Sequence, residues 1–214
     1  MHFEKILFRE MPDSILVNGL EYQLYTDYRT WLKAGHILSK LNSKNGEDIL
    51  FEVCDLVVYK YPEKGYNLGD DFIQGILDFY KGFPKTDNEL NEKKKEKEKN
   101  SPKPPDFDFY FDIEYIYCSF MSFYGIRLET VEFMHWWEFL ILFEGLMMSD
   151  QTSMNFVVGT RQRKINSKMS KEEKALLEKQ KRQFALPQDE ETKEAQNTLT
   201  DILSGGKKKK SNSN

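Results

Sequence analysis

The sequence predicts a mainly α-helical domain with a small N-terminal β-hairpin, a disordered charged linker and a disordered C-terminal tail. Apolar residues recur at helical spacing in several segments before residue 165. Asn18-Gly19 stands between two short apolar runs, which is a strong hairpin signal. Residues 85–106 are charged and proline-rich, and residues after 187 are polar, so neither segment can bury enough surface to offset its ordering entropy.

The composition favours one compact domain with polar extensions, since the 214 residues are 39% hydrophobic and 31% charged with a net charge of -4. The longest apolar run, Phe139 to Phe143, is far shorter than the ~20 residues that cross a bilayer. The start of the chain lacks the pattern of a signal peptide. We therefore expect no membrane partner and a cytoplasmic protein, in which Cys54 and Cys118 are reduced core residues of predicted helices.

The first part of the chain predicts the hairpin and three helices. Thr26 or Asp27 can cap the first helix, which is followed by a turn at 41–46. The next helices are expected over 47–60 and 70–81. The apolar face of the first helix comprises Tyr28, Trp31, Leu32, Ile37, Leu38 and Leu41.

The central stretch, 107–148, predicts two helices that the other elements surround. The first ends at Gly125, which can adopt the left-handed conformation of a helix stop. The second is expected from Thr130 to Met148 and is apolar on nearly every face, so it lies at the centre of the core or against a partner. The apolar stripe of the first comprises Phe109, Ile113, Ile116, Tyr117, Phe120, Phe123 and Tyr124.

Two further helices are expected after the central stretch. The first covers 153–164, and the second begins at the capping box of Ser170 and Glu173 and runs to about Phe184. We divide the chain into four parts: residues 1–84 with the hairpin and first helices, the linker 85–106, the helical region 107–165, and the polar helix and tail 166–214.

Glu132 and His135 form the most tempting catalytic pair, because a carboxylate and an imidazole three residues apart on one helix make half of a di-iron site. The chain has only three histidines, and neither of the others follows a Glu at that spacing. We therefore expect no metal and no cofactor, and interpret Glu132, His135 and Glu138 as the polar edge of the second central helix.

Trp136 and Trp137 allow two interpretations. Adjacent helical residues point about 100° apart, so both rings are buried only if the helix is covered on two sides. That cover is either the chain's own core or a protein partner, because tryptophan is favoured in both settings. Neither interpretation implies a reaction.

Clusters of cations follow the central helices. Arg161, Arg163, Lys164 and Lys168 can meet phosphates, but they more often complement a helix C-terminus. The Lys207–Lys210 run is interpreted as a solvated tail, since no aromatic platform precedes it. Phosphate-binding loops, nucleophile elbows and zinc spacings are lacking in the sequence, so we expect neither an enzyme nor a specific nucleic-acid partner.

Four motifs resemble the bacteriophage "gene product fifteen" family, over roughly Ser14 to Lys164. These motifs are Tyr124-Gly-Ile-Arg-Leu128, Met134-His-Trp-Trp-Glu-Phe139, Glu144-Gly-Leu146 and Phe156-Val-Val-Gly-Thr-Arg161. Two residues depart from the family pattern, in which Asp usually replaces Arg127 and Arg often replaces Glu138. One hypothesis is that these two positions form an ion pair with its signs reversed. The residues taken as core or partner-binding signature are Tyr124, Gly125, Met134, His135, Trp136, Trp137, Phe139, Gly145, Leu146 and Arg161.

The resemblance implies a role in building the tail of a long-tailed phage. Family members are similar to tail assembly chaperones, which hold the tape measure protein soluble until tail-tube subunits polymerise along it. The expected partners are thus the tape measure protein and, second, the major tail protein, in the host cytoplasm. The outward face of the central helices is the expected partner surface. Two alternatives stay open: a structural minor component retained in the virion tail, and a metal-dependent oxidoreductase built on Glu132 and His135.

Overall fold

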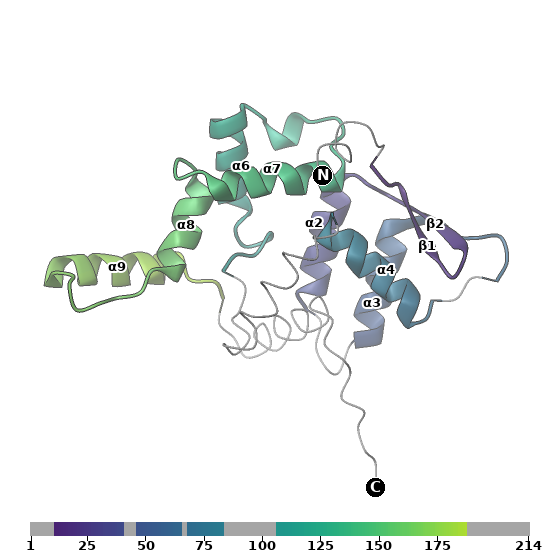
Figure 1. The fold of residues 1–214 in the computed structure, drawn as a ribbon, viewed down its shortest axis with the longest axis horizontal. Helices are drawn as coiled ribbons and strands as arrows, with labels where there is room; N and C mark the ends of the chain where they lie inside the picture. Colours follow the sequence, from purple (N-terminus) through teal and green to yellow (C-terminus); the bar gives the residue numbers. More distant parts are fainter. Residues whose placement is uncertain (1–10, 41–45, 66–67, 84–105, 188–214) are drawn as a thin grey trace, which may run out of the picture.

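A computed structural model describes residues 11–40, 46–65, 68–83 and 106–187 (Figure 1). Most of this part of the chain is helical, as the sequence predicts. Apart from Gly46 and Asp106, the predicted turn at 41–46 and the predicted linker lie outside the described residues, and so does the tail after Pro187. Within the described part, no helix combines the length and the apolar character that crossing a membrane requires.

The N-terminal hairpin is confirmed and forms part of a three-stranded antiparallel sheet. Strands β1 (Ser14–Val17) and β2 (Leu20–Leu24) flank Asn18 and Gly19, whose φ angles of 52° and 79° are those a type I′ turn requires. The third strand, β3 (Val58–Lys60), pairs with the other edge of β2.

The expected helix over 47–60 is therefore wrong at its end, because α3 (Gly46–Val57) stops where β3 begins. Val58 and Tyr59 are residue types that favour strands, and Val58 and Lys60 pair with Leu24 and Gln23 of β2. Of the other two early helices, α4 (Asp70–Lys81) has the predicted bounds. Helix α2 (Tyr28–Leu38) ends three residues before Leu41, which was expected on its apolar face and lies outside the described residues. Asp27 caps α2 by accepting a hydrogen bond from the Arg29 amide at 3.0 Å.

The first central helix is shorter than its apolar stripe predicts. Helix α6 (Ile113–Ser119) continues into a π-helical turn, η1 (Phe120–Tyr124), which turns the Phe123 ring outward to 44% exposure. Gly125 stops the helix as predicted, with φ of 69° and a bond from its amide to the Met121 carbonyl. Cys118 lies off the buried face of α6 and is exposed, so its predicted core position is wrong, whereas Cys54 is buried.

The second central helix begins six residues later than expected. A short turn, η2 (Leu128–Thr130), precedes an extended segment, and α7 (Trp136–Met148) follows it. The reason is tertiary: Asp27 and His135 form an antiparallel bridge, with bonds from the Trp136 amide to the Thr26 carbonyl (2.7 Å) and from the Tyr28 amide to the Met134 carbonyl (3.0 Å). This pairing holds 134–135 extended and places the starts of α2 and α7 side by side.

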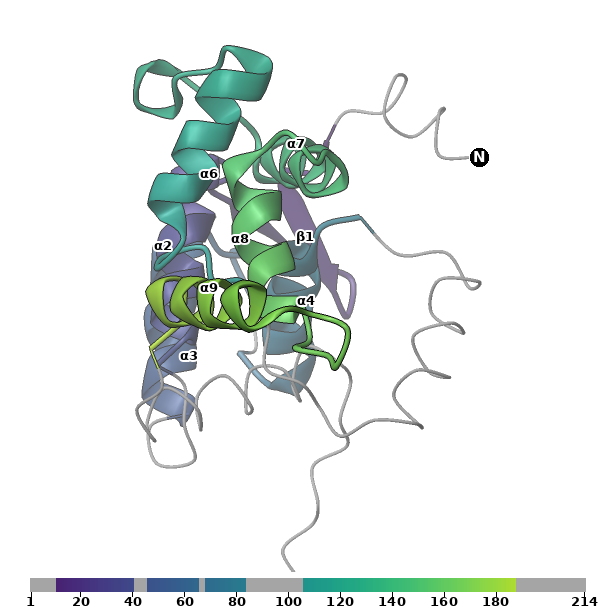
Figure 2. The same cartoon turned by 90° about the vertical axis from the view of Figure 1, so that its left-hand side faces the viewer.

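Two helices complete the described chain. Helix α8 (Ser153–Gln162) packs against α6 and α7, and α9 (Lys171–Gln183) begins with the predicted capping box of Ser170 and Glu173. In Figure 2, α8 lies between α7 and α9. In Figure 1, α9 lies at the opposite end of the molecule from the sheet, with α7 between them.

Candidate functional site: the motif core and an adjoining groove

The two tryptophans of the motif satisfy the end of another helix. The indole nitrogen of Trp136 donates to the Tyr80 carbonyl and that of Trp137 to the Phe79 carbonyl, each at 2.9 Å. The last carbonyls of a helix have no partner within it, so the two indoles cap the C-terminus of α4. Trp136 is fully buried in the core, and Trp137 is partly buried against it.

Aromatic rings fill the space around Trp136. Its ring stacks on those of Trp31, Tyr80 and Phe139, with centroids 6.4, 5.5 and 5.5 Å away. Phe139 also stacks on Phe120 of the π-helical turn, at 5.1 Å. These rings join α2, α4, η1 and α7 into one core, in which stacked aromatic pairs add stability beyond the area they bury.

His135 is the N-cap of α7 and not a residue within it. Its Nδ1 accepts a hydrogen bond from the Trp137 amide at 3.0 Å, so in the neutral ring Nε2 bears the proton and donates to the Pro12 carbonyl, also at 3.0 Å. Burial lowers the pKa of His135, while the Pro12 carbonyl and the nearby Glu138 oppose that shift. Both ring nitrogens of His135 are thus engaged in hydrogen bonds within the fold.

The expected polar edge of Glu132, His135 and Glu138 does not form on one helix, because Glu132 precedes α7 and is exposed. In the part of the chain that the structure describes, no three His, Cys, Asp or Glu side chains gather where they could hold a metal ion. The geometry therefore offers no support for the Glu132–His135 metal site.

The remaining helix motifs fix the approach of η1 to α7. The Tyr124 hydroxyl donates to the Leu142 carbonyl at 3.0 Å and lies over Gly145, where a Cβ would collide with it. Gly145 therefore permits this close approach. Met134 and Leu146 are buried beside these elements.

Arg161 forms a buried bidentate ion pair with Asp112. Two bonds of 2.7 Å join its guanidinium to the carboxylate, and the side chains of Arg161 and Asp112 are only 11% and 1% exposed. The same guanidinium donates to the carbonyls of Asp106 and Phe184. Arg161 thus ties α8 to the start of α6 and to the end of α9, and it does not merely solvate a helix end.

The hypothetical pair between Arg127 and Glu138 is absent from the described residues. Arg127 instead bonds Glu129 two residues away, with nitrogen–oxygen distances of 2.8 and 2.9 Å. Both partners are exposed, because the turn at η2 directs them to the surface.

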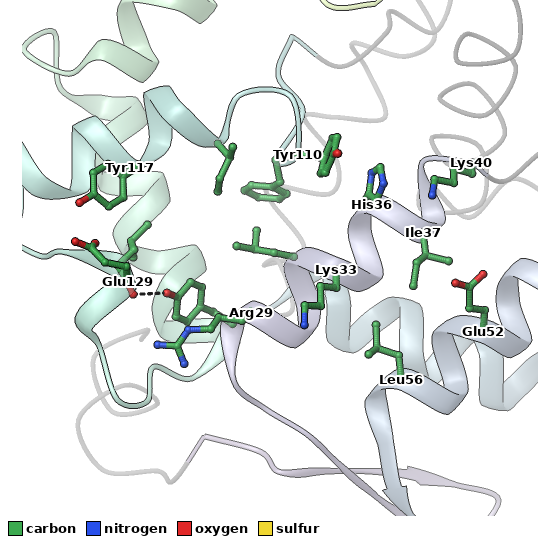
Figure 3. A pocket seen from close by; sticks show the side chains of 15 residues that line it. Arg29, Lys33, His36, Ile37, Lys40, Glu52, Leu56, Tyr110, Tyr117 and Glu129 are labelled. Carbon is green, nitrogen blue, oxygen red and sulfur yellow. Dashed lines mark hydrogen bonds between the residues drawn. The ribbon is translucent and has the colours of Figure 1, made fainter.

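An open groove of about 710 Å³ lies beside this core, between α2, α3 and the segment that leads into α6. Its labelled side chains extend from Tyr117 and Glu129 at one end to Lys40 and Glu52 at the other (Figure 3). Most of its lining is apolar. The apolar and aromatic lining consists of Tyr28, Leu32, Ile37, Leu56, Phe109, Tyr110, Ile113, Tyr117 and Leu128.

Helix α2 gives the groove a basic edge. Arg29, Lys33, His36 and Lys40 recur every three or four residues and so share one face of this part of the chain. Arg29 is occupied by Asp27 and by the carbonyl of Val131. Lys33, by contrast, is exposed and makes no hydrogen bond or ion pair with any described residue.

His36 of α2 and Tyr110 of the segment before α6 meet at the groove. Their rings stack with centroids 3.7 Å apart, and His36 Nδ1 is buried without a hydrogen-bond partner in the described part of the chain. Burial and the charge of Lys40 both lower the pKa of His36, although Asp108 opposes this shift, so the neutral ring is favoured. The Tyr110 side chain itself stays 52% exposed at the rim.

None of the ten signature residues lines this groove, and sequence reasoning did not single the groove out. A signal for it was present: Arg29, Lys33, His36 and Lys40 have helical spacing on a helix that was predicted. Phe109, Ile113 and Tyr117 of the opposite wall also stand out in the sequence, but there they are predicted to belong to the apolar stripe of the first central helix.

The chain matches the family model described as "Bacteriophage Gp15 protein" over residues 7–186. Comparisons with curated proteins and with solved structures give no match. The family match spans most of the 214 residues and includes every motif that resembles the "gene product fifteen" pattern. The protein therefore belongs to the bacteriophage Gp15 protein family.

Proposed function

We propose that this phage protein is a tail assembly chaperone that binds the tape measure protein during long-tail morphogenesis, in the host cytoplasm. The chain belongs to a bacteriophage protein family. Its motifs resemble those of proteins whose genes lie next to that of the tape measure protein, where tail assembly chaperones are encoded. The observation that favours binding is the groove beside α2. It is mainly apolar, has a volume of about 710 Å³, is open to solvent, and lies beside a well-packed core. Exposed apolar grooves of this kind are typical of sites that bind other proteins or ligands.

The chemistry of the motif residues supports a binding protein more than a catalyst. His135 is held by Pro12 and Trp137, and Arg161 by Asp112, so neither is free to act on a substrate. The groove itself holds one histidine, two carboxylates and three cations among mainly apolar side chains. Such a lining suits the apolar face of a helix, which long tape measure proteins present in abundance.

Co-expression tests this proposal. The tape measure protein of the same phage is expressed alone, with this protein, or with an unrelated phage protein of similar size as the control. We expect the tape measure protein to become soluble, and to co-purify, only with this protein. Failure to change its solubility or to co-purify would contradict the proposal, and the major tail protein is the second bait.

Purified virions separate the chaperone from its alternative. A chaperone leaves the tail when the tube is complete, so mass spectrometry should not detect this protein in virions at the level of tail components. Stoichiometric detection there would instead favour a structural minor tail component.

A further inference from the structure

We infer that the groove beside α2 binds an amphipathic helix of the partner, with the apolar face of that helix on the groove floor and its carboxylates along the basic edge of α2. This deepens the proposed function, on which it rests, by naming the surface and the kind of segment it accepts.

The dimensions of the basic edge favour a helix lying along α2. From Arg29 to Leu38 the basic edge lies on α2 and spans roughly 14 Å along its axis at 1.5 Å per residue, and Lys40 follows two residues beyond the end of the helix. A partner helix of about three turns spans that length. The groove is elongated in the same sense, from Tyr117 and Glu129 to Lys40 and Glu52 (Figure 3).

The charges favour carboxylates on the partner. The chain is acidic overall, at -4, yet the α2 side of the groove carries three cations, of which Arg29 is paired with Asp27 and Lys40 also has an interaction partner. Lys33 lies in the middle of this edge without a partner among the described residues. Of the two lining carboxylates, Glu129 is already paired with Arg127, which leaves Glu52 on α3. An acidic stripe on the bound helix would therefore meet attraction along α2 and little repulsion.

The other side of the groove supplies the apolar contact. Tyr110 and Ile113 are exposed there, and the half-buried Leu32 and Leu56 also line the groove. Exposed aromatic and aliphatic side chains of this kind are the anchors of helix-in-groove recognition, where apolar residues of the partner recur at i, i+3, i+4 and i+7. A helix with an apolar face and an adjacent acidic face can contact the apolar wall and the basic edge of α2 at the same time.

Site-specific photo-crosslinking tests the inference with the full chain and the co-expressed tape measure protein. A benzoylphenylalanine replaces Lys33 in the groove, or Lys179 on α9 as the control. Lys179 is exposed and lies on a helix at the other end of the molecule from α3 (Figure 1). We expect crosslinks from position 33 only, and the crosslinked segment should carry apolar residues at helical spacing with Asp or Glu on the adjacent face.

Two matched charge variants give a second test. Lys33→Glu and Lys179→Glu change the net charge equally, so only the position differs. We expect Lys33→Glu to weaken binding of the tape measure protein by about three- to tenfold, and Lys179→Glu to leave it unchanged. Ile113→Glu should weaken it by about tenfold or more, because it places a carboxylate in the apolar wall.

The outcomes distinguish the two proposals. Absence of any complex with the unmodified chain contradicts the proposed function. A complex that forms, but crosslinks equally at positions 33 and 179 or tolerates both Lys33→Glu and Ile113→Glu, overturns the groove assignment alone. Crosslinks between two copies of this chain, or to a segment without acidic residues, also overturn it. Circular dichroism and thermal melting of each variant show that a loss of binding is not a loss of fold.

Discussion

The core around α7 and the groove beside α2 differ in what their residues do. In the core, the most distinctive motif side chains are occupied: both indoles cap α4, His135 caps α7, and Arg161 holds Asp112. In the groove, Lys33 has no partner among the described residues, and the Tyr110 ring is half-exposed. Most residues of the family motifs thus build the scaffold, whereas the surface suited to a partner consists, apart from Leu128, of residues outside the motifs.

This difference follows from the physical demands on each region. A buried polar group must keep its hydrogen-bond partners, so residues such as Trp136 and Arg161 tolerate little change. A groove wall needs only apolar area and a favourable sign of charge, which many residue types supply. Substitutions in the core should therefore change stability, and substitutions in the groove should change binding.

The largest expected effect is that of Trp136→Ala. It removes a fully buried indole, its stacking on three rings, and the cap on the Tyr80 carbonyl. We expect a loss of about 3–5 kcal/mol in the free energy of unfolding, measured by urea denaturation. Tyr110→Ala, at the rim of the groove, is the control and should stay within about 1 kcal/mol of the unmodified chain. Equal losses would contradict the division into core and groove.

Arg161→Met comes next in size, because it leaves the Asp112 carboxylate buried without its cation. We expect a loss of about 3 kcal/mol, at the low end for broken buried pairs since Arg161 is not completely buried. The double variant with Asp112→Asn should recover part of this loss, because the amide carries no charge and can still accept from the Asp108 amide. A double variant less stable than Arg161→Met would refute the buried pair.

His135→Ala should destabilise the protein by roughly 1–2 kcal/mol, through loss of the α7 cap and of the bond to the Pro12 carbonyl. His135→Asn keeps a capping oxygen and should recover much of this.

The pKa of His135 adds a pH signature to the same pair of variants. This pKa lies below its ordinary value of 6.5 in the folded state, so as the pH falls His135 is protonated at a higher pH in the unfolded chain than in the folded one. Stability is therefore full above pH 6.5, falls as the pH drops through 6.5, and stops falling below the folded pKa. His135→Asn should show a smaller decrease over that window in denaturation curves at several pH values. An identical decrease would show that His135 is not buried in the neutral form.

Gly145→Ala gives the smallest of these effects and the sharpest double-mutant test. The new Cβ collides with the Tyr124 hydroxyl, which costs about 1–3 kcal/mol, while replacing a helical glycine returns about 1 kcal/mol. The expected net loss is roughly 1 kcal/mol. In the Tyr124→Phe background the hydroxyl is gone and Gly145→Ala should become neutral or stabilising. The same loss in both backgrounds would refute the contact.

Local sequence signals predicted the elements whose reasons are local. Asn18-Gly19 set the hairpin turn, Gly125 the helix stop, and Ser170 with Glu173 the start of α9. The helix over 70–81 was also predicted at its observed bounds.

Two of the predictions that were wrong depend on partners far away in the chain. Val58–Lys60 becomes a strand because the edge of β2 pairs with it, and residues 134–135 stay extended because they pair with the residues before α2. The place of Asp112 was likewise hidden, since its partner Arg161 lies 49 residues away. The four family motifs located the scaffold, but the groove required knowing that α2 and the start of α6 lie together.

The central claim is that the motif residues hold the fold while the groove holds the partner. The most direct test is the amount of tape measure protein that co-purifies with equal amounts of folded Trp137→Phe and Ile113→Glu. Trp137→Phe removes only an indole cap in the core, so it should retain the partner at the level of the unmodified chain. Ile113→Glu should lose most of it. Loss of the partner by folded Trp137→Phe, with retention by Ile113→Glu, would contradict the account.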